Sequence, residues 1–189
     1  MSQTVRLRRD ARRNREALLN AAKELFAESG DVPMYEVARR AGVGQATLYR
    51  NFADRDALIA ALSEEWVDEL ERVGAEHAGE PDAFFVLLRA IVESQARFHG
   101  LIDCAQESSA INRELESLQQ RLIALFKRTL RDAKAAGLVR RDLTVDDVVL
   151  LMGMVEGALS READAAGRAA AASRVLALAL DGLASPNST

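Results

Sequence analysis

Apolar residues recur at helical spacing along most of this 189-residue chain. The clearest run returns every three or four positions over Ile111, Leu115, Leu118, Leu122, Leu125, Phe126 and Leu130. This period places the apolar side chains on one face of an α-helix. Aromatic residues make up only 5% of the chain, and β-branched residues are also scarce, which disfavours an all-β fold. The pattern predicts an all-α protein of about nine helices.

Turn-forming residues divide these runs into separate helices. Gly30, Gly42, Pro81 and Gly137 each follow or interrupt an apolar run, as glycine and proline commonly do. The first helix is expected to begin within the C-terminal part of the arm formed by residues 1–15 and to end before residue 29. The later helices are expected over residues 33–41, 45–52, 56–77, 84–98, 101–108, 111–136, 144–159 and 165–183. Residues 138–140 are the single candidate strand, and residues 185–189 are expected to fray.

Residues at three predicted helix starts suit those positions. Pro33 fits the first turn of the second helix, where its missing N–H would have no partner. Asp54 is a good N-cap for the fourth helix. Thr144 with Asp147 three residues later is a variant of the capping box and predicts the start of the eighth helix.

The charge is distributed unevenly along the chain. The formal net charge is −4. Residues 1–55 hold ten Arg and one Lys against seven acidic residues, a net of +4, so the remaining 14 basic and 22 acidic residues give −8. Residues 1–15 alone hold six Arg and one Asp. The asymmetry predicts that one end meets a polyanion. The arm itself is expected to be a solvated, disordered extension, and the alternative is that its Arg residues enter a minor groove or screen phosphates.

Several classes of protein are disfavoured. Cys104 is the single cysteine, which excludes an internal disulfide, and the two histidines, His77 and His99, leave little for a metal site. No apolar run approaches the roughly 20 residues of a membrane span, and no signal peptide follows the basic N-terminus. No enzyme or phosphate-binding motif is present, so we expect no catalytic residue, no cofactor and a cytoplasmic protein.

Residues 35–52 contain the ingredients of a helix-turn-helix. Val37 and Ala38 give the first helix a small apolar face, and Gly42 suits the tight corner. Val43, Leu48 and Phe52 are expected to face the core. The residues left for the outer face and helix start are Gln45, Ala46, Thr47, Tyr49, Arg50 and Asn51. This division of apolar and polar residues is typical of a helix that reads the major groove.

At these residues the chain resembles the TetR family of bacterial transcriptional regulators. Leu48 and Tyr49, followed by Phe52 and then by Asp56-Ala57-Leu58, are similar to the recognition helix of that family and the start of its fourth helix. The segment 37–43 resembles its second helix and turn. The resemblance in sequence covers about residues 12–62, and beyond them it is one of helix number and order.

The resemblance implies roles for individual residues. Gln45 and Thr47 match positions that contact bases or phosphates, Tyr49 and Asn51 match phosphate-binding positions, and Arg55 matches a basic residue that touches the DNA backbone. The full set of implied DNA contacts is Gly44, Gln45, Thr47, Tyr49, Arg50, Asn51 and Arg55. One departure is Pro33, which stands where the family often has a Thr that caps the helix and binds phosphate.

The resemblance also implies the organisation of the chain. Residues 1–55 would form the DNA-binding domain with its basic arm, and residues 56–185 the domain for effector binding and dimerisation. The homodimer would form through the eighth and ninth helices, where Gly153 and Gly157 lie four residues apart and the ninth helix is rich in Ala. A monomer that packs these faces internally is the alternative.

The family usually holds a small-molecule pocket in the helical body. Candidate lining residues are Trp66, Phe84, Phe85, Gln95, Phe98, His99, Met152 and Glu156. For each single aromatic residue and Met, ordinary core packing is the better explanation. Glu156 interrupts an otherwise apolar run, so its carboxylate must face water, pair with a cation or meet a ligand.

These observations favour a ligand-responsive repressor that binds a pseudo-palindromic, double-stranded DNA operator as a dimer. One alternative is a helical module that binds a small molecule or a partner without reading DNA. Another is a thiol-dependent enzyme that uses Cys104 with the nearby His99 and Glu107. Sequence-selective, salt-dependent DNA binding separates the first alternative from the repressor.

Overall fold

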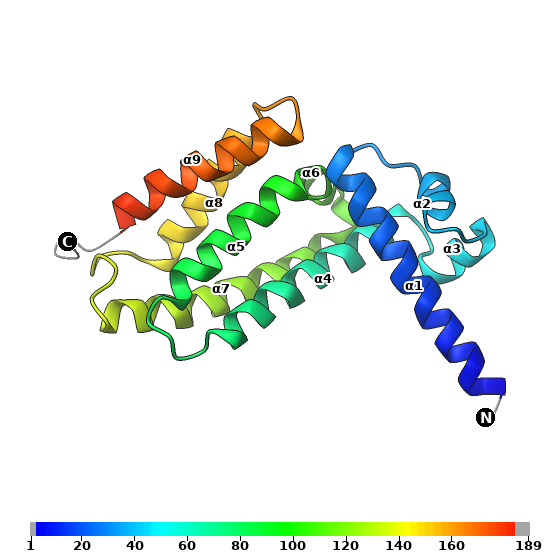
Figure 1. The fold of residues 1–189 in the computed structure, drawn as a ribbon, viewed down its shortest axis with the longest axis horizontal. Helices are drawn as coiled ribbons and strands as arrows, with labels where there is room; N and C mark the ends of the chain where they lie inside the picture. The colour runs from blue at the N-terminus through cyan, green and yellow to red at the C-terminus, as the bar shows by residue number, and fades with distance from the viewer. Residues whose placement is uncertain (1–2, 184–189) are drawn as a thin grey trace. The chain divides into compact units, whose positions relative to one another are not determined.

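The computed structural model describes residues 3–183, with the side chains of residues 9–105 and 107–183. Nine α-helices and one short 3-10 helix form the regular structure of this described part (Figure 1), which confirms the all-α prediction. Their bounds are α1 Gln3–Glu28, α2 Met34–Arg40, α3 Gln45–Asn51, α4 Arg55–Glu76, α5 Ala83–Arg97, α6 His99–Glu107, η1 Ser109–Ile111, α7 Asn112–Ala135, α8 Val145–Leu159 and α9 Ala165–Leu183. The tail predicted to fray, residues 185–189, lies outside the described residues.

The main difference from the predicted elements is the start of α1. This helix begins at Gln3, so the basic arm is helical and not an irregular extension. The segment contains no Gly or Pro before Gly30, and Arg and Ala are strong helix formers, which explains the earlier start. The short 3-10 helix η1 was not predicted.

The predicted turns and caps are confirmed at several positions. Gly42 and Gly137 adopt left-handed conformations with φ of 67° and 73°. Oδ1 of Asp54 accepts a hydrogen bond of 2.8 Å from the backbone N–H of Ala57 in the first turn of α4. At the start of α8 the backbone N–H of Asp147 donates to Thr144 Oγ1, and that of Thr144 donates to Asp147, forming a complete capping box.

The chain forms two compact units. The first consists of the residues up to Glu64 together with Gly100–Leu115, and the second of Glu65–His99 together with the residues from Glu116. The boundary falls inside α4 and again directly after His99, the first residue of α6. Most of α6 therefore belongs to the same unit as α1, α2 and α3.

The first unit is built on a small apolar core. Helix α1 packs against α2 and α3, which also pack against each other. Leu18, Phe26, Val37 and Leu48 are almost completely buried where these helices meet. The start of α4 adds Leu58, Ile59 and Leu62 to the buried set. This core holds α3 in place and leaves its opposite face open.

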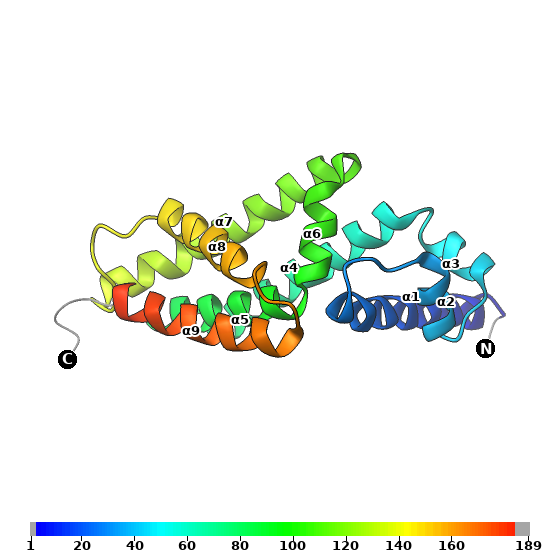
Figure 2. The same ribbon diagram turned by 90° about the horizontal axis from the view of Figure 1, so that it is seen from above.

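In the second unit, α5 packs against α8 and α9, and Figure 2 shows these three helices side by side. Its core includes Phe84, Leu87, Leu88, Phe126, Val155, Leu159 and Leu176. In the same unit, Arg121 of α7 forms ion pairs with Asp68 and Glu71 of α4, and the distance to Glu71 is 2.7 Å.

Within residues 3–183, every helix is too short or too polar to cross a membrane.

Candidate nucleic-acid interface

The turn between α2 and α3 sets the direction of α3. The left-handed Gly42 reverses the chain, and the backbone N–H of Val43 donates a 3.0 Å hydrogen bond to the carbonyl of Ala38. Leu48 then anchors α3, because its side chain is fully buried against the core of the first unit. The two short helices and this turn form a helix-turn-helix, as predicted.

The outer face of α3 carries hydrogen-bonding groups. Gly44, Gln45, Tyr49 and Arg50 are exposed, whereas Thr47 and Asn51 are half-buried. Tyr49 leaves 52% of its surface open, an unusual exposure for a large aromatic side chain. Six of the predicted DNA contacts therefore lie on α3 or at its N-cap, Gly44.

Local hydrogen bonds hold two of these side chains in place. The guanidinium of Arg50 donates to Thr47 Oγ1 at 2.9 Å. The amide of Asn51 donates to the carbonyl of Thr47 at 2.7 Å, as part of the last turn of α3. The polar tips are thus partly ordered before any partner binds, which lowers the entropic cost of binding.

Arg55, the remaining predicted DNA contact, is engaged within the first unit. Its guanidinium donates to the carbonyl of Gly30 at 2.7 Å and approaches Cys104 Sγ at 3.2 Å, and Cys104 in turn donates to the same carbonyl at 2.9 Å. The guanidinium carbon also lies 5.9 Å from the ring centre of Phe26. Arg55 therefore links the end of α1, the start of α4 and α6 within the first unit.

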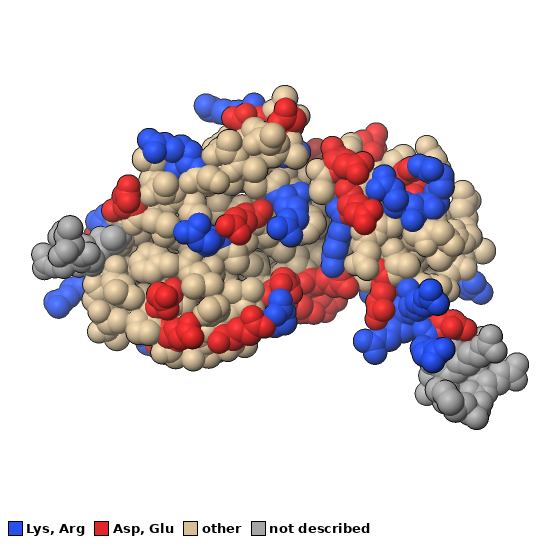
Figure 3. All heavy atoms as spheres, in the orientation of Figure 1, with Lys and Arg blue, Asp and Glu red and all other residues tan. Residues whose placement is uncertain are grey.

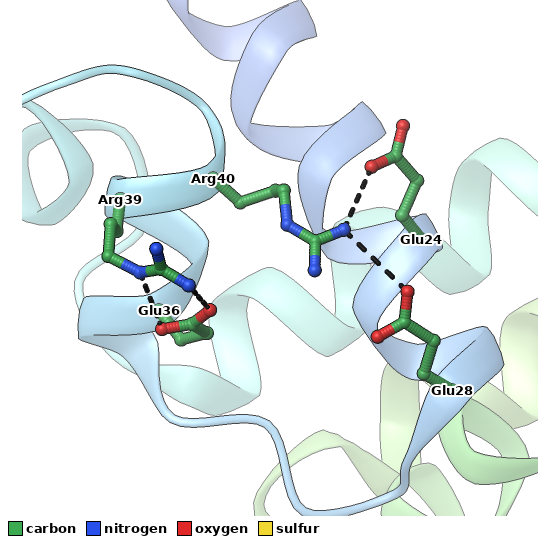
Figure 4. Close-up of polar contacts among 5 residues, drawn as sticks. All are labelled: Glu24, Glu28, Glu36, Arg39 and Arg40. Carbon is green, nitrogen blue, oxygen red and sulfur yellow. Dashed lines mark hydrogen bonds and ion pairs between the residues drawn. The ribbon is translucent and has the colours of Figure 1, made fainter.

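Arginines of α2 are engaged by carboxylates (Figure 4). Arg40 reaches Glu24 at 3.2 Å and Glu28 at 3.7 Å, which ties α2 to α1. Arg39 pairs with Glu36 one turn earlier on the same helix, and its hydrogen bond lowers the pKa of that carboxyl. The sequence did not indicate a role for Arg40, because its partners lie on another helix and no periodic pattern in the sequence reports contacts between helices.

The start of α2 has no side-chain cap. Pro33 is the N-cap residue, with extended backbone angles and no side-chain hydrogen bond to the first turn. Its carbonyl still accepts from the backbone N–H groups of Glu36 and Val37. The phosphate contact that a Thr would supply at this point has no equivalent in the Pro33 side chain.

A polar group interrupts the apolar interior of the second unit. Nδ1 of His99 lies 2.8 Å from Oε1 of Glu156, and both side chains are largely buried, at 12% and 16% exposure. Gln95, one helical turn before His99, is 7% exposed. Its carboxamide oxygen finds no hydrogen-bond partner among the side chains that the structure describes. Nearby in the sequence, Ser94 Oγ accepts a 2.8 Å hydrogen bond from the indole N–H of Trp66.

The remaining pocket candidates take part in ordinary packing. Phe84 is fully buried and makes edge contacts with Phe85 and Phe126, with ring centres 5.4 and 6.2 Å apart. Trp66, Phe85 and Met152 are half-buried and pack against the same core. Phe98 is also half-buried, and the guanidinium of Arg97 lies 5.8 Å from its ring centre.

Cys104 is a buried thiol of α6 that lies beside Arg55. Its side chain is 8% exposed, and burial raises the pKa of the thiol, although Arg55 acts in the opposite direction. A neutral thiol is a poor nucleophile. Glu107, on the same helix, is exposed.

The first unit thus has the features of a helix-turn-helix DNA-binding protein, with a buried Leu on one side of α3 and hydrogen-bonding groups on the other. The family model described as bacterial regulatory proteins of the tetR family matches residues 18–62. The model for the C-terminal domain of SbtR-like transcriptional regulators matches residues 80–185.

Solved structures agree with these matches. A TetR transcription regulatory protein from Mycobacterium vanbaalenii is 32% identical, with a TM-score of 0.67 over 94% of this chain and 99% of that chain. A TetR transcriptional regulator from Streptomyces coelicolor is 30% identical, with a TM-score of 0.64 over 91% and 99% of the two chains. The chain belongs to the TetR family of bacterial transcriptional regulators.

Curated relatives match over a shorter segment. An HTH-type transcriptional regulator of Staphylococcus aureus is 39% identical over 54 residues, which is 28% of this chain. The match spans 29% of the length of that relative.

Proposed function

We propose that this protein is a dimeric, ligand-responsive repressor that binds a pseudo-palindromic DNA operator through α3. The observation that carries the proposal is the two-sided character of α3, with Leu48 buried and Gln45, Tyr49 and Arg50 exposed. In this proposal residues 1–55 bind DNA, and residues 56–185 bind the effector and form the dimer.

The contacts proposed for DNA follow from side-chain chemistry. Gln45 stands in the first turn of α3, where a carboxamide can pair with a base edge in the major groove. The backbone N–H groups that follow Gly44, together with Thr47, Tyr49, Arg50 and Asn51, suit phosphate oxygens. Arg55 acts in this proposal as a positioning residue, since its guanidinium is already committed to the carbonyl of Gly30.

The proposed dimer seam is the outer side of α8 and α9. Four large apolar side chains are exposed there: Val149, Leu150, Met154 and Leu178. Gly153 and Gly157 are also exposed, and a Cβ at either would meet nothing within 4 Å in the single chain. Small residues beside large apolar ones allow close helix packing against a second copy, and they support an interface of this kind.

The proposed effector site is the polar group of Gln95, His99 and Glu156. A buried carboxamide oxygen without a partner costs free energy that a bound donor would recover. His99 is followed directly by Gly100 of α6, and Gly100 packs against Gly30 near Arg55. An effector that displaces His99 would also shift Gly100, which follows it in the chain. The coupling free energy between effector binding and DNA binding would be about 1–3 kcal/mol.

The proposal is tested by enrichment of a random duplex pool on the purified, ligand-free protein. We expect a palindromic motif whose half-sites are spaced by one or more helical turns. Binding that is weak and independent of sequence would contradict the proposal and favour a small-molecule-binding module. The enriched duplex would then serve to screen effectors, which should release it.

A further inference from the structure

Helix α1 extends beyond the core that it helps to form. The first buried side chain among those described on α1 is Leu18, and residues 9–16 are exposed apart from the half-buried Asn14. Figure 1 shows these N-terminal turns standing clear of α2 and α3. A helical segment that is so little packed in the single chain is available for contact with another molecule.

The extension is strongly basic. Arg9, Arg12, Arg13 and Arg15 are exposed, against the acidic residues Asp10 and Glu16 on the same stretch. Figure 3 shows Lys and Arg side chains gathered on this part of the molecule. Arg12 pairs with Glu16 at 2.8 Å, but both side chains are open to solvent, at 84% and 57% exposure. Such a pair contributes little and exchanges easily for a phosphate.

Two of these arginines lie on the side of α1 that faces α3. The guanidinium of Arg15 lies 4.6 Å from the ring centre of Phe52, the residue that caps the C-terminal end of α3. Arg12 stands three residues earlier and hence on the same side of α1, one turn further out. Arg15 therefore lies beside the end of α3, and Arg12 lies one turn further out on α1.

We propose that the N-terminal turns of α1 form a basic helix that contacts the phosphates of DNA flanking the segment read by α3. The inference rests on the proposed DNA binding of α3 and adds a second surface to it. An α-helix is about 10–12 Å wide and the minor groove about 6 Å, so the helix lies along the phosphates and does not enter that groove. These contacts carry no base specificity.

The test compares wild-type protein with the triple variant Arg9→Ala, Arg12→Ala, Arg13→Ala. Alanine preserves helix propensity, so the variant loses charge and keeps its helix. Binding is measured at several salt concentrations on the duplex enriched by the wild type, once with ten extra base pairs on each side and once trimmed to the motif. On the long duplex, the slope of log K against log salt concentration should become less steep by about 0.9 for each lost phosphate contact. For a dimer, which loses contacts in both copies, the change should be about 2 or more. On the trimmed duplex the two proteins should bind alike.

Two control proteins separate this effect from net charge and from arginine geometry. Arg89, Arg131 and Arg161 are exposed residues of the second unit, and their replacement by Ala removes the same charge. This control should keep the wild-type slope, and so should the Lys variant of Arg9, Arg12 and Arg13, because a phosphate needs only a cation there.

An unchanged slope in the triple variant, or an equal loss in the body control, would overturn the inference while leaving the function of α3 intact. Unchanged DNA binding with altered sedimentation would assign the basic helix to contacts between protein copies, and would also overturn it. A wild-type protein that enriches no sequence would overturn both the proposed function and this inference.

Discussion

At the scale of single residues, Tyr49 carries much of the argument for DNA binding. Burying an aromatic ring normally stabilises a fold, yet about half of this side chain (52%) faces solvent on α3. Leu48 beside it is fully buried, so one neighbour packs in the core while the other faces solvent.

We expect Tyr49→Ala to weaken binding to the enriched duplex by about tenfold or more, because one phosphate hydrogen bond per chain, about 1 kcal/mol each, is lost. The melting temperature should not change, since the side chain packs little. Tyr49→Phe, which keeps the ring, should reproduce most of the loss if the hydroxyl makes the contact. Affinity equal to wild type in both variants would remove Tyr49 from the interface.

Cys104 gives a second prediction at this scale. Burial raises the pKa of its thiol, so the thiolate is scarce at neutral pH. Alkylation by iodoacetamide should be slow at pH 7, and its rate should still be rising above pH 9, the ordinary value for a thiol. The urea-unfolded chain should react with an ordinary pH profile. A plateau below pH 8 in the folded protein would instead support the reactive thiol of the enzyme alternative.

Local chemistry could be predicted from the sequence at residues such as Gly42, Asp54 and Thr144, because a turn or a cap depends on neighbours in the chain. The inward position of Arg55 could not. Its partners Gly30 and Cys104 stand 25 and 49 residues away, and no periodic pattern reports such contacts.

At the scale of elements, α6 approaches the end of α1 closely in the first unit. A Cβ at Gly100 would lie 2.8 Å from Cα of Gly30 and 2.9 Å from the carbonyl oxygen of Phe26. These are backbone atoms, which cannot rotate away as a side chain does. Apart from the start of α1 and the unpredicted η1, the helix bounds could be predicted from the apolar period, whereas this packing of distant elements could not.

The variant Gly100→Ala should therefore lower stability by about 1–3 kcal/mol, the usual cost of overpacking. That corresponds to a fall of about 3–10 °C in melting temperature. Gly182→Ala is the matched control, because a Cβ there meets nothing within 4 Å. Thermal unfolding of both variants, followed by circular dichroism, is the measurement. Equal melting temperatures for Gly100→Ala and wild type would contradict the close packing of α6.

At the scale of the whole molecule, the single chain exposes large apolar side chains on α8. Leu150 and Met154 expose 65% and 62% of their area one turn apart on α8. The family match over residues 80–185 includes both helices of this face. The apolar pattern of α8 and α9 allowed the face to be predicted, but the grouping of residues 100–115 with α1–α3 was not predictable, since it depends on tertiary contacts alone.

Replacing Leu150 and Met154 by Glu should convert the proposed dimer to a monomer, because two carboxylates per chain would be buried at the seam without partners. Sedimentation equilibrium at micromolar protein measures the change. Ala135→Glu, at an exposed position of α7, should remain dimeric. A double variant that sediments like the wild type would exclude this face as the seam.

The central claim is that two copies of α3 read DNA from the major groove. Methylation interference on the enriched duplex tests it most directly, since methylated guanine N7 blocks contacts in that groove. We predict two symmetric clusters of interfering guanines, separated by one helical turn, about 10 base pairs, or a multiple of it. A single cluster, or binding that tolerates methylation throughout, would contradict the account.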